Sequence, residues 1–361
     1  MVALTLALLF LPACGAARVP VDATPHLSPS EDPIRQEQWH LKFLRIDEVH
    51  RVTRGAGVVV GLIDTGVDNH PDLAGSVLPG ADFGPLKSDG RKDISGHGTA
   101  MAGLIAGHGR ILGIAPEAKI LPVKPLFANE NGGVVDTEEP VRWAVDHGAT
   151  IISLSIGDDA PNPAWARAIQ YAIAKNVVVV AAVNNTTQGT HPSGLAMAPG
   201  VVVVSGIDKK GEFDSISLSG DVVTVAAPAR DCWSSRLDGR YGSGTGTSNS
   251  TAITAGVVAL IRSRFPHLDA AGVVRRLIAT ADDKGAPGHD PLYGFGVINP
   301  LGAVTATLAS EGAPDTVPPS TSPHAAGPTP DRPGWIIIAA ALGLLAAAAG
   351  LALWARARRA R

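Results

Sequence analysis

The sequence predicts an α/β fold in three layers, in which a mainly parallel central sheet is covered by helices. The first observation is a set of Val- and Ile-rich runs without polar alternation, typical of strands buried on both faces: residues 57–63, 150–156, 177–183 and 201–206. The second is a set of stretches with helical spacing between them: residues 98–107, 139–147, 164–175 and 252–264. Strands that alternate with helices are joined by right-handed crossovers, which makes the sheet parallel. In such sheets the functional site lies at the carboxyl ends of the strands.

Composition limits both the class of protein and the way in which it is stabilised. The chain has 361 residues, enough for a large core, and we expect one globular domain. A formal net charge of −3 gives no basic surface with which to bind nucleic acid. Cys14 and Cys232 are the only cysteines, so packing and not a disulfide framework must stabilise the fold. We interpret Cys232 as a small buried apolar residue.

The N-terminus has the features of a signal peptide. Residues 1–17 hold an apolar run followed by small residues, which favours export of the chain, although no Lys or Arg precedes Arg18. The stretch that ends at Cys14 also resembles a lipoprotein cleavage site, but Pro12 fits that pattern badly, so we favour ordinary cleavage. We expect residues 18–54 to be an N-terminal extension and residues 55–310 to form the globular body.

The C-terminus predicts a membrane anchor. Residues 335–354 carry no charge and are long enough, as a helix, to span the hydrocarbon core of a bilayer. A buried soluble helix is the alternative, but Trp335 and Trp354 suit the two membrane interfaces and a basic tail follows at residues 355–361. Residues 311–334 are rich in Pro, Ser and Thr, which is typical of an extended linker. We therefore predict a single-pass protein whose body is extracytoplasmic and whose C-terminus is cytoplasmic.

Three residues at the edges of predicted elements could act together. Asp64 follows the first Val-rich run, His97 lies between two glycines, and Ser248 opens a helix. Each alone has an ordinary structural interpretation, as a turn aspartate, a lone histidine and a helix N-cap. Nucleophilic acyl transfer, however, needs a hydroxyl, an imidazole that takes its proton and a carboxylate that orients the imidazole. The chain order Asp, His, Ser is also a known order for such a triad.

The sequence around these residues resembles the subtilisin family, also called peptidase S8. The motifs that carry the resemblance are Leu62-Ile63-Asp64-Thr65-Gly66, Gly96-His97-Gly98-Thr99 and Gly246-Thr247-Ser248. The resemblance implies a subtilisin-like three-layer fold and a serine endopeptidase that acts on proteins or peptides without a cofactor. It implies Asp64, His97 and Ser248 as the catalytic triad. Relatives bind calcium, but no clustered acidic loop here predicts metal ligands.

Two further stretches resemble parts of the family's substrate site. Ser155, Ile156 and Gly157 stand where family members bind substrate as an added strand. Asn185 stands where an Asn side chain helps to bind the oxyanion, with a structural turn as the alternative interpretation. Asn184 replaces the usual Gly, which puts the local turn in question because Gly adopts positive φ at no steric cost. Ala252 replaces the Pro that usually follows the nucleophile, a change that we expect to affect detail and not mechanism.

The whole layout resembles the mycosins, the actinobacterial subtilases associated with type VII secretion. A short N-terminal extension, a subtilase body, a Pro-rich linker and one C-terminal span make up the likeness. It implies processing of exported proteins at the outer membrane face, in association with type VII secretion components. One alternative is a structural subunit of a secretion complex with little proteolytic turnover, against which the complete triad argues. An esterase or lipase is the other, and no Gly-x-Ser-x-Gly motif surrounds Ser248 to support it.

Overall fold

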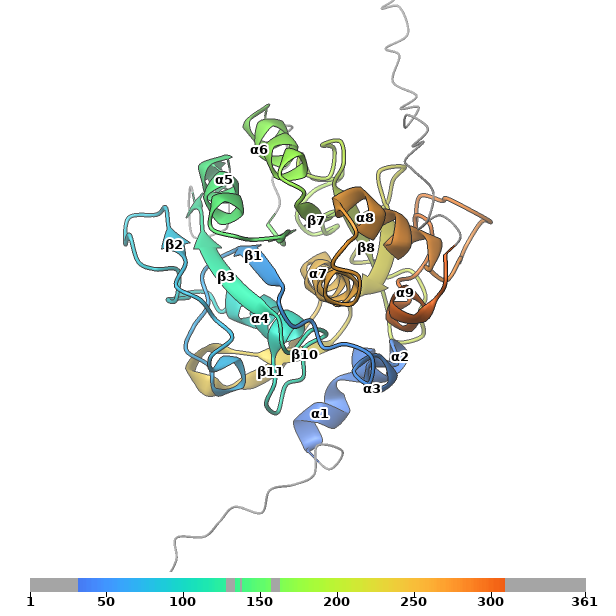
Figure 1. The fold of residues 1–361 in the computed structure, drawn as a ribbon, viewed down its shortest axis with the longest axis horizontal. Helices are drawn as coiled ribbons and strands as arrows, with labels where there is room; N and C mark the ends of the chain where they lie inside the picture. Colours follow the sequence, from blue (N-terminus) through green and yellow to red (C-terminus); the bar gives the residue numbers. More distant parts are fainter. Residues whose placement is uncertain (1–31, 128–133, 137, 157–162, 309–361) are drawn as a thin grey trace, which may run out of the picture. The chain divides into compact units, whose positions relative to one another are not determined.

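A parallel sheet of seven strands forms the centre of the protein (Figure 1), in a computed structural model that describes residues 32–127, 134–136, 138–156 and 163–308. The strands are β1 (Val59–Ile63), β2 (Ala81–Asp82), β3 (Lys119–Lys124), β6 (Ile151–Leu154), β7 (Val178–Ala182), β8 (Val202–Ile207) and β9 (Val225–Pro228). Their order is β2-β3-β1-β6-β7-β8-β9, and all neighbouring pairs are parallel. The predicted parallel sheet is confirmed.

Helices cover both faces of this sheet. On one face lie α4 (His97–Ala106), α7 (Thr247–Arg264) and α8 (Ala270–Ala279), and on the other lie α5 (Glu138–Asp146) and α6 (Pro163–Ala174). Helix α7 packs on β6, β7, β8 and β9, whereas α5 packs on β1 and β3 and α6 packs on β7. The layers are therefore helix, sheet and helix, as predicted.

Shorter elements surround the three layers. The helical ones are α1 (Pro33–Glu37), α2 (Trp39–Phe43), α3 (Ile46–Val49), α9 (Pro300–Thr305) and the 3₁₀ turns η1 (Pro71–Leu73) and η2 (Leu237–Gly239). Two antiparallel hairpins pair β4 (Leu126–Phe127) with β5 (Val134–Asp136), and β10 (Cys232–Ser235) with β11 (Tyr241–Gly244). The second hairpin packs against α4 and so lies close to the start of that helix.

The central strands have no polar alternation because each of their faces lies in a hydrophobic core. Val178 and Val180 of β7 belong to the core under α4 and α7. Val179 and Ala181 of the same strand belong to the core under α5 and α6. Side chains alternate between the faces of a strand, so a strand covered on both sides needs apolar residues at every position.

Helix α7 runs through the first of these cores. From Thr247 to Ile261 nearly every residue is buried, which is the pattern of a helix surrounded by protein on all sides. The stretch at residues 252–264 was predicted to have helical spacing and Ser248 to open a helix, and the structure begins α7 at Thr247. Ser248 therefore lies in the first turn of this buried helix.

The described part of the N-terminal extension packs as part of the body. Side chains of α2 and α3, including Leu41 and Ile46, belong to the same core as α7. The amide of Gln38 donates to the carbonyl oxygen of Leu112 at 2.9 Å and accepts from the Leu112 N–H at 2.9 Å. Trp39 Nε1 donates to the carbonyl oxygen of Arg230 at 2.8 Å. These contacts tie the extension to segments far along the chain.

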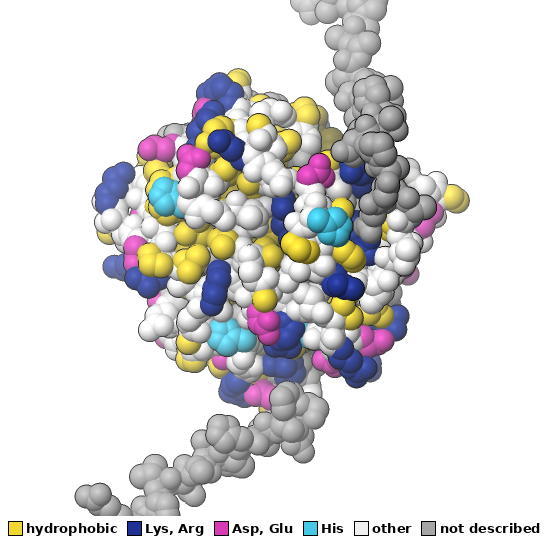
Figure 2. Space-filling model, in the orientation of Figure 1, with side chains coloured by type: hydrophobic (Ala, Val, Ile, Leu, Met, Phe, Trp, Pro, Cys, Tyr) yellow, Lys and Arg dark blue, Asp and Glu magenta, His cyan; other side chains and the backbone are white. Residues whose placement is uncertain are grey.

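The predicted targeting segments lie outside the described residues. These are the signal peptide at 1–17, the linker at 311–334, the span at 335–354 and the tail at 355–361. Of the helices within the described ranges, none has the length and apolar character needed to cross a bilayer. On the face drawn in Figure 2, acidic and basic side chains are interspersed, in keeping with the net charge of −3.

His40 makes the stability of the body sensitive to acid. Its ring is fully buried, and neither nitrogen has a hydrogen-bond partner among the described residues. Burial lowers the pKa of His40 from 6.5 to about 3, so below the ordinary pKa only the unfolded chain binds this proton. The free energy of unfolding should therefore fall by roughly 2 kcal/mol from about pH 7 to about pH 5 through this residue.

Urea unfolding of the wild type and of His40→Leu at both pH values measures that contribution. The His40→Leu variant should lose less stability on acidification than the wild type, by the stated amount. Equal losses in the two proteins would contradict the assignment of this pH dependence to His40.

Candidate active site

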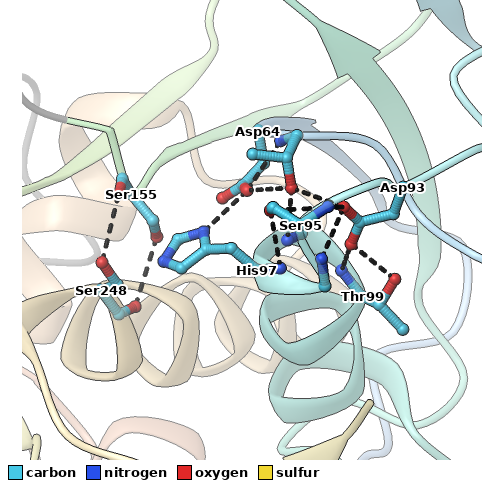
Figure 3. A network of polar contacts seen from close by, with 10 residues as sticks. Asp64, Asp93, Ser95, His97, Thr99, Ser155 and Ser248 are labelled. Carbon is cyan, nitrogen blue, oxygen red and sulfur yellow. Dashed lines mark hydrogen bonds and ion pairs between the residues drawn. The ribbon is translucent and has the colours of Figure 1, made fainter. Parts of the chain in front are cut away.

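The residues predicted to act together lie at the carboxyl edge of the sheet (Figure 3). Asp64 directly follows β1, Ser155 directly follows β6, and Asn185 lies shortly after β7. His97 is the first residue of α4, and Ser248 is the second residue of α7. Three strand ends and two helix starts therefore meet at one place, where a parallel sheet is expected to hold its functional site.

Asp64 and His97 form a short hydrogen bond. His97 Nδ1 and Asp64 Oδ1 are 2.7 Å apart, and the Asp64 side chain is 1% exposed whereas the His97 side chain is 37% exposed. The backbone N–H of Thr65 donates to the same carboxylate oxygen at 2.8 Å. A carboxylate can only accept from His97, so Nδ1 carries the proton and Nε2 is the free base. The pair supplies an oriented proton acceptor.

Ser248 and Ser155 exchange two hydrogen bonds. Ser248 Oγ donates to the carbonyl oxygen of Ser155 at 3.1 Å, and Ser155 Oγ donates to the carbonyl oxygen of Ser248 at 3.3 Å. Figure 3 shows the His97 ring between this serine pair and Asp64. Within the described residues no hydrogen bond joins Ser248 to His97, and such bonds often form only when substrate binds. Transfer of its proton to His97 would require the hydroxyl to turn away from Ser155.

The turn that carries Asn185 has the geometry that was in question. Asn184 adopts φ of 109°, the region in which glycine is at no disadvantage. Asn is among the few other residues that enter it, because its short side chain bonds locally. Here Asn184 Oδ1 accepts from the backbone N–H of Asn185 at 2.9 Å. The family's turn therefore forms with Asn in place of Gly.

Asn185 connects this turn to the start of α7. Its Oδ1 accepts from the backbone N–H of Thr247 at 2.8 Å and from the Thr247 hydroxyl at 3.0 Å. Its Nδ2 donates to Gln188 Oε1 at 2.8 Å. The amide oxygen is thus fixed beside the residue before Ser248, and the amide nitrogen is held by an exposed side chain that substrate could displace.

If Asn185 is the oxyanion donor that the resemblance implies, replacing it with alanine should lower kcat by about 10²–10³-fold with little change in KM. Gln188→Ala is the matched control, because it removes the resting partner of the amide nitrogen and leaves the donor in place. It should retain kcat within about threefold. Steady-state kinetics on one peptide would contradict the oxyanion role if both variants kept wild-type kcat.

The predicted substrate strand is described only in part. Ser155 and Ile156 continue from β6 and are buried at 7% and 9% exposure. Gly157 lies outside the described residues. Ser155 contacts Ser248 through both its side chain and its carbonyl oxygen, so the predicted strand segment and the predicted nucleophile are neighbours.

Asp93 is a part of the site that the sequence analysis missed. Its Oδ1 accepts from the Thr65 hydroxyl at 2.8 Å and from the Gly96 N–H at 2.9 Å. Its Oδ2 accepts from the Thr99 N–H at 2.9 Å and from the Thr99 hydroxyl at 2.7 Å. One buried carboxylate therefore ties the turn after Asp64 to the first turn of α4. An Asp shortly before a Gly-His-Gly motif was the available signal.

Opposing influences set the pKa of His97. Burial lowers it, but the charge and hydrogen bond of Asp64 and the charge of Asp93 raise it by more, so the pKa lies above the ordinary 6.5. A protonated imidazole cannot act as a base. We therefore expect kcat/KM to fall as the pH drops through this raised pKa.

Measuring kcat/KM on an uncharged peptide between about pH 5 and pH 9 tests this expectation. The wild type should show its acidic limb above pH 6.5. Asp93→Asn should move the limb to lower pH, because it removes a charge that raises the pKa of His97. A limb at or below pH 6.5 in the wild type would contradict the described electrostatics.

Comparisons with known proteins agree on one family. The model of the Subtilase family matches residues 55–296. Mycosin-4 of Mycobacterium tuberculosis is 34% identical over 331 residues, which cover 76% of this chain and 72% of that protein. The thermostable alkaline protease of Halalkalibacterium halodurans is 33% identical over 267 residues, 72% of each chain. The crystal structure of MycP1 from the ESX-1 type VII secretion system matches at a TM-score of 0.68 and 29% identity, covering 78% of this chain and 88% of that chain.

Proposed function

Since the chain belongs to the subtilase family and is a serine endopeptidase, we propose that Asp64, His97 and Ser248 are its catalytic triad. The observation that carries this proposal is the 2.7 Å hydrogen bond between buried Asp64 and His97 at the carboxyl edge of the sheet. It leaves Nε2 of His97 as the base on the side of Ser248.

In the proposed reaction, Ser248 Oγ attacks the carbonyl carbon of a peptide bond while His97 Nε2 takes its proton. Asp64 stabilises the imidazolium that results. The Asn185 amide and backbone N–H groups donate to the oxyanion of the tetrahedral intermediate. The intermediate collapses to an acyl-enzyme as His97 gives the proton to the leaving amine. Water then attacks the acyl carbon while His97 takes its proton, and the acid product is released.

Substrate should enter this site as an additional strand. Ser155 and Ile156 directly follow β6, where the family resemblance implies backbone pairing with a peptide, and Gly157, the third residue of this segment, lies outside the described residues. An extended peptide paired there would bring its carbonyl to Ser248, which contacts Ser155 directly.

Incubation of the full-length protein with a mixture of unfolded polypeptides tests this activity. Mass spectrometry of the new N-termini should show cleavage that a fluorophosphonate abolishes and a metal chelator leaves intact. Cleavage that the chelator stops, while the fluorophosphonate has no effect, would contradict a serine mechanism.

The membrane anchor and the secretion role are further parts of the proposal. The signal at 1–17, the linker at 311–334 and the span at 335–354 support a body outside the membrane and a short tail inside. Similarity to Mycosin-4 and to MycP1 of a type VII system supports processing of exported proteins. Membrane fractionation of the full chain should place it with the membrane, and recovery as a soluble cytoplasmic protein would contradict this part.

A comparison in cells separates an enzyme role from a structural one. Deletion of the gene and the Ser248→Ala substitution are examined side by side for secretion and for substrate processing. Loss of processing with secretion intact in Ser248→Ala indicates the enzyme role proposed here. Secretion that fails on deletion, with processing unchanged in Ser248→Ala, would indicate a structural subunit instead.

A further inference from the structure

A half-buried cation lies near the active site without a carboxylate to neutralise it. Arg236 directly follows β10, and within the described ranges it takes part in no ion pair. Its guanidinium donates to the carbonyl oxygen of Ser243 across the hairpin. Burial lowers the pKa of Arg236, and no acid in the described part of the chain offsets this effect. A partly desolvated charge in that position is prepared to bind an anion.

Two glycines make room for this guanidinium. Gly242 and Gly244 of β11 pair with Ser234 and Cys232, so all four positions share one face of the hairpin. A Cβ atom built on Gly244 would lie 2.9 Å from Arg236 Nη2, and one built on Gly242 would lie 3.3 Å from Nε. The Arg236 side chain therefore runs back along β11, where larger residues would displace it.

The same face of the hairpin lies against the helix that begins with His97. Ser234 Oγ donates to the carbonyl oxygen of Ala100 in α4 at 2.6 Å. A Cβ atom on Gly96, the residue before His97, would lie 3.1 Å from the side chain of Leu237. The residue that follows Arg236 thus lies beside the residue that precedes His97.

The charge of Arg236 reaches that imidazole. Burial lowers the pKa of His97, the charges of Asp64 and Asp93 raise it, and the positive charge of Arg236 lowers it. Ser155 approaches Ser248 from the end of β6, whereas the hairpin approaches from the side of α4. Because His97 must pass its proton to the leaving amine, the substrate segment after the scissile bond runs past the α4 side.

We propose that Arg236 binds the carboxylate of an acidic substrate residue located shortly after the scissile bond, and so makes this protein select acidic leaving segments. The inference rests on the proposed function, since it concerns the substrate of that same site. A Glu or Asp side chain supplies the missing counter-charge, and a guanidinium binds a carboxylate with two parallel hydrogen bonds.

Matched peptides that differ only in Glu or Gln, at each of the first few positions after the scissile bond, test the proposal with full-length protein. We expect kcat/KM to favour Glu by about tenfold at one of these positions, and the preference to weaken with added salt. Arg236→Gln should abolish the preference while keeping the activity on the Gln peptide, since Gln can still donate to Ser243. It should also move the acidic limb of kcat/KM to higher pH, because a charge that lowers the pKa of His97 is gone.

Two further variants test whether the preference depends on the charge of Arg236 in particular and on the space that surrounds its guanidinium. Arg240→Gln removes a cation of the same hairpin that is exposed and paired with Asp238 at 3.0 Å, and it should leave the preference unchanged. Gly244→Ala keeps Arg236 but crowds its guanidinium, and it should reduce the preference. Equal kcat/KM for the Glu and Gln peptides in the active wild type would overturn the inference alone. A wild type that cleaves neither peptide would overturn the proposed function and this subsite with it.

Discussion

Ser248→Ala should lower kcat for peptide cleavage by about 10⁶-fold, the loss that removal of the nucleophile causes in subtilisin itself. The reason is chemical, because the hydroxyls of Thr247, Ser250 and Thr251 in the same part of α7 bond to Asn185, Ala227 and Thr247, away from His97. The fold should survive, because among the described residues the side-chain hydroxyl bonds only to the Ser155 carbonyl oxygen. The change in the free energy of unfolding should stay within about 1 kcal/mol.

Ser250→Ala is the matched control for this variant. Ser250 lies in the same turn of α7, but its hydroxyl is buried and donates to the carbonyl oxygen of Ala227 at 2.9 Å. Its loss should cost about 1 kcal/mol of stability and leave most of the activity. Kinetics and thermal unfolding of the two variants distinguish chemistry from folding. Activity that persists in Ser248→Ala would exclude it as the nucleophile.

Asp64→Asn should lower kcat by about 10⁴-fold. The asparagine amide could donate to His97 Nδ1, which would leave the ring proton on Nε2 and remove the base on the side of Ser248. It would also remove the charge that stabilises the imidazolium, and the pKa of His97 should fall. The loss of kcat should exceed that from losing the hydrogen bond between residue 64 and His97 alone, because His97 protonated on Nε2 cannot take the proton of Ser248.

Asp68→Asn provides the comparison for Asp64→Asn. Asp68 belongs to the same loop, is only partly buried, and has its carboxylate directed to the backbone N–H of Asp238 at 3.3 Å. It should change kcat by less than about threefold. If Asp64→Asn and Asp68→Asn lost activity to the same degree, the loop and not the orientation of His97 would be the cause.

The central strands could be predicted because burial on both faces makes nearly every one of their residues apolar. β6, β7 and β8 are buried on both faces and lack polar residues at regular spacing, which separates them from half-exposed strands. β3 escaped prediction because Lys119 and Lys124 bound it and Pro122 lies inside it. Pro122 cannot donate a backbone hydrogen bond, and only tertiary packing makes its strand recognisable.

Elements that depend on distant contacts were also missed. Helices α1, α2 and α3 are each too short to be stable alone, and they form because residues such as Ile46 pack into the core of α7. The hairpin of β10 and β11 is rich in Gly and Ser, with little hydrophobic pattern to mark it. Its position against α4 was not accessible from sequence.

Some residues of the site could be predicted from sequence motifs, and others are recognised only from their surroundings in the structure. Asp64, His97 and Ser248 stand in short motifs that were recognisable, and the structure brings their three elements together. Asp93 and Arg236 stand in no motif that was used, and their roles follow from burial and from what surrounds them. A carboxylate that accepts four or more hydrogen bonds, or a guanidinium that forms no ion pair within the described ranges, is visible only in three dimensions.

Labelling with a fluorophosphonate, which reacts only with an activated serine, tests the central claim most directly. Full-length wild type, Ser248→Ala and Ser250→Ala are treated alike, and the modified residue is located by mass spectrometry. We predict one adduct on Ser248 in the wild type and in Ser250→Ala, and none in Ser248→Ala. An unlabelled wild type, or an adduct that persists in Ser248→Ala, would contradict the assignment of Ser248 as the nucleophile.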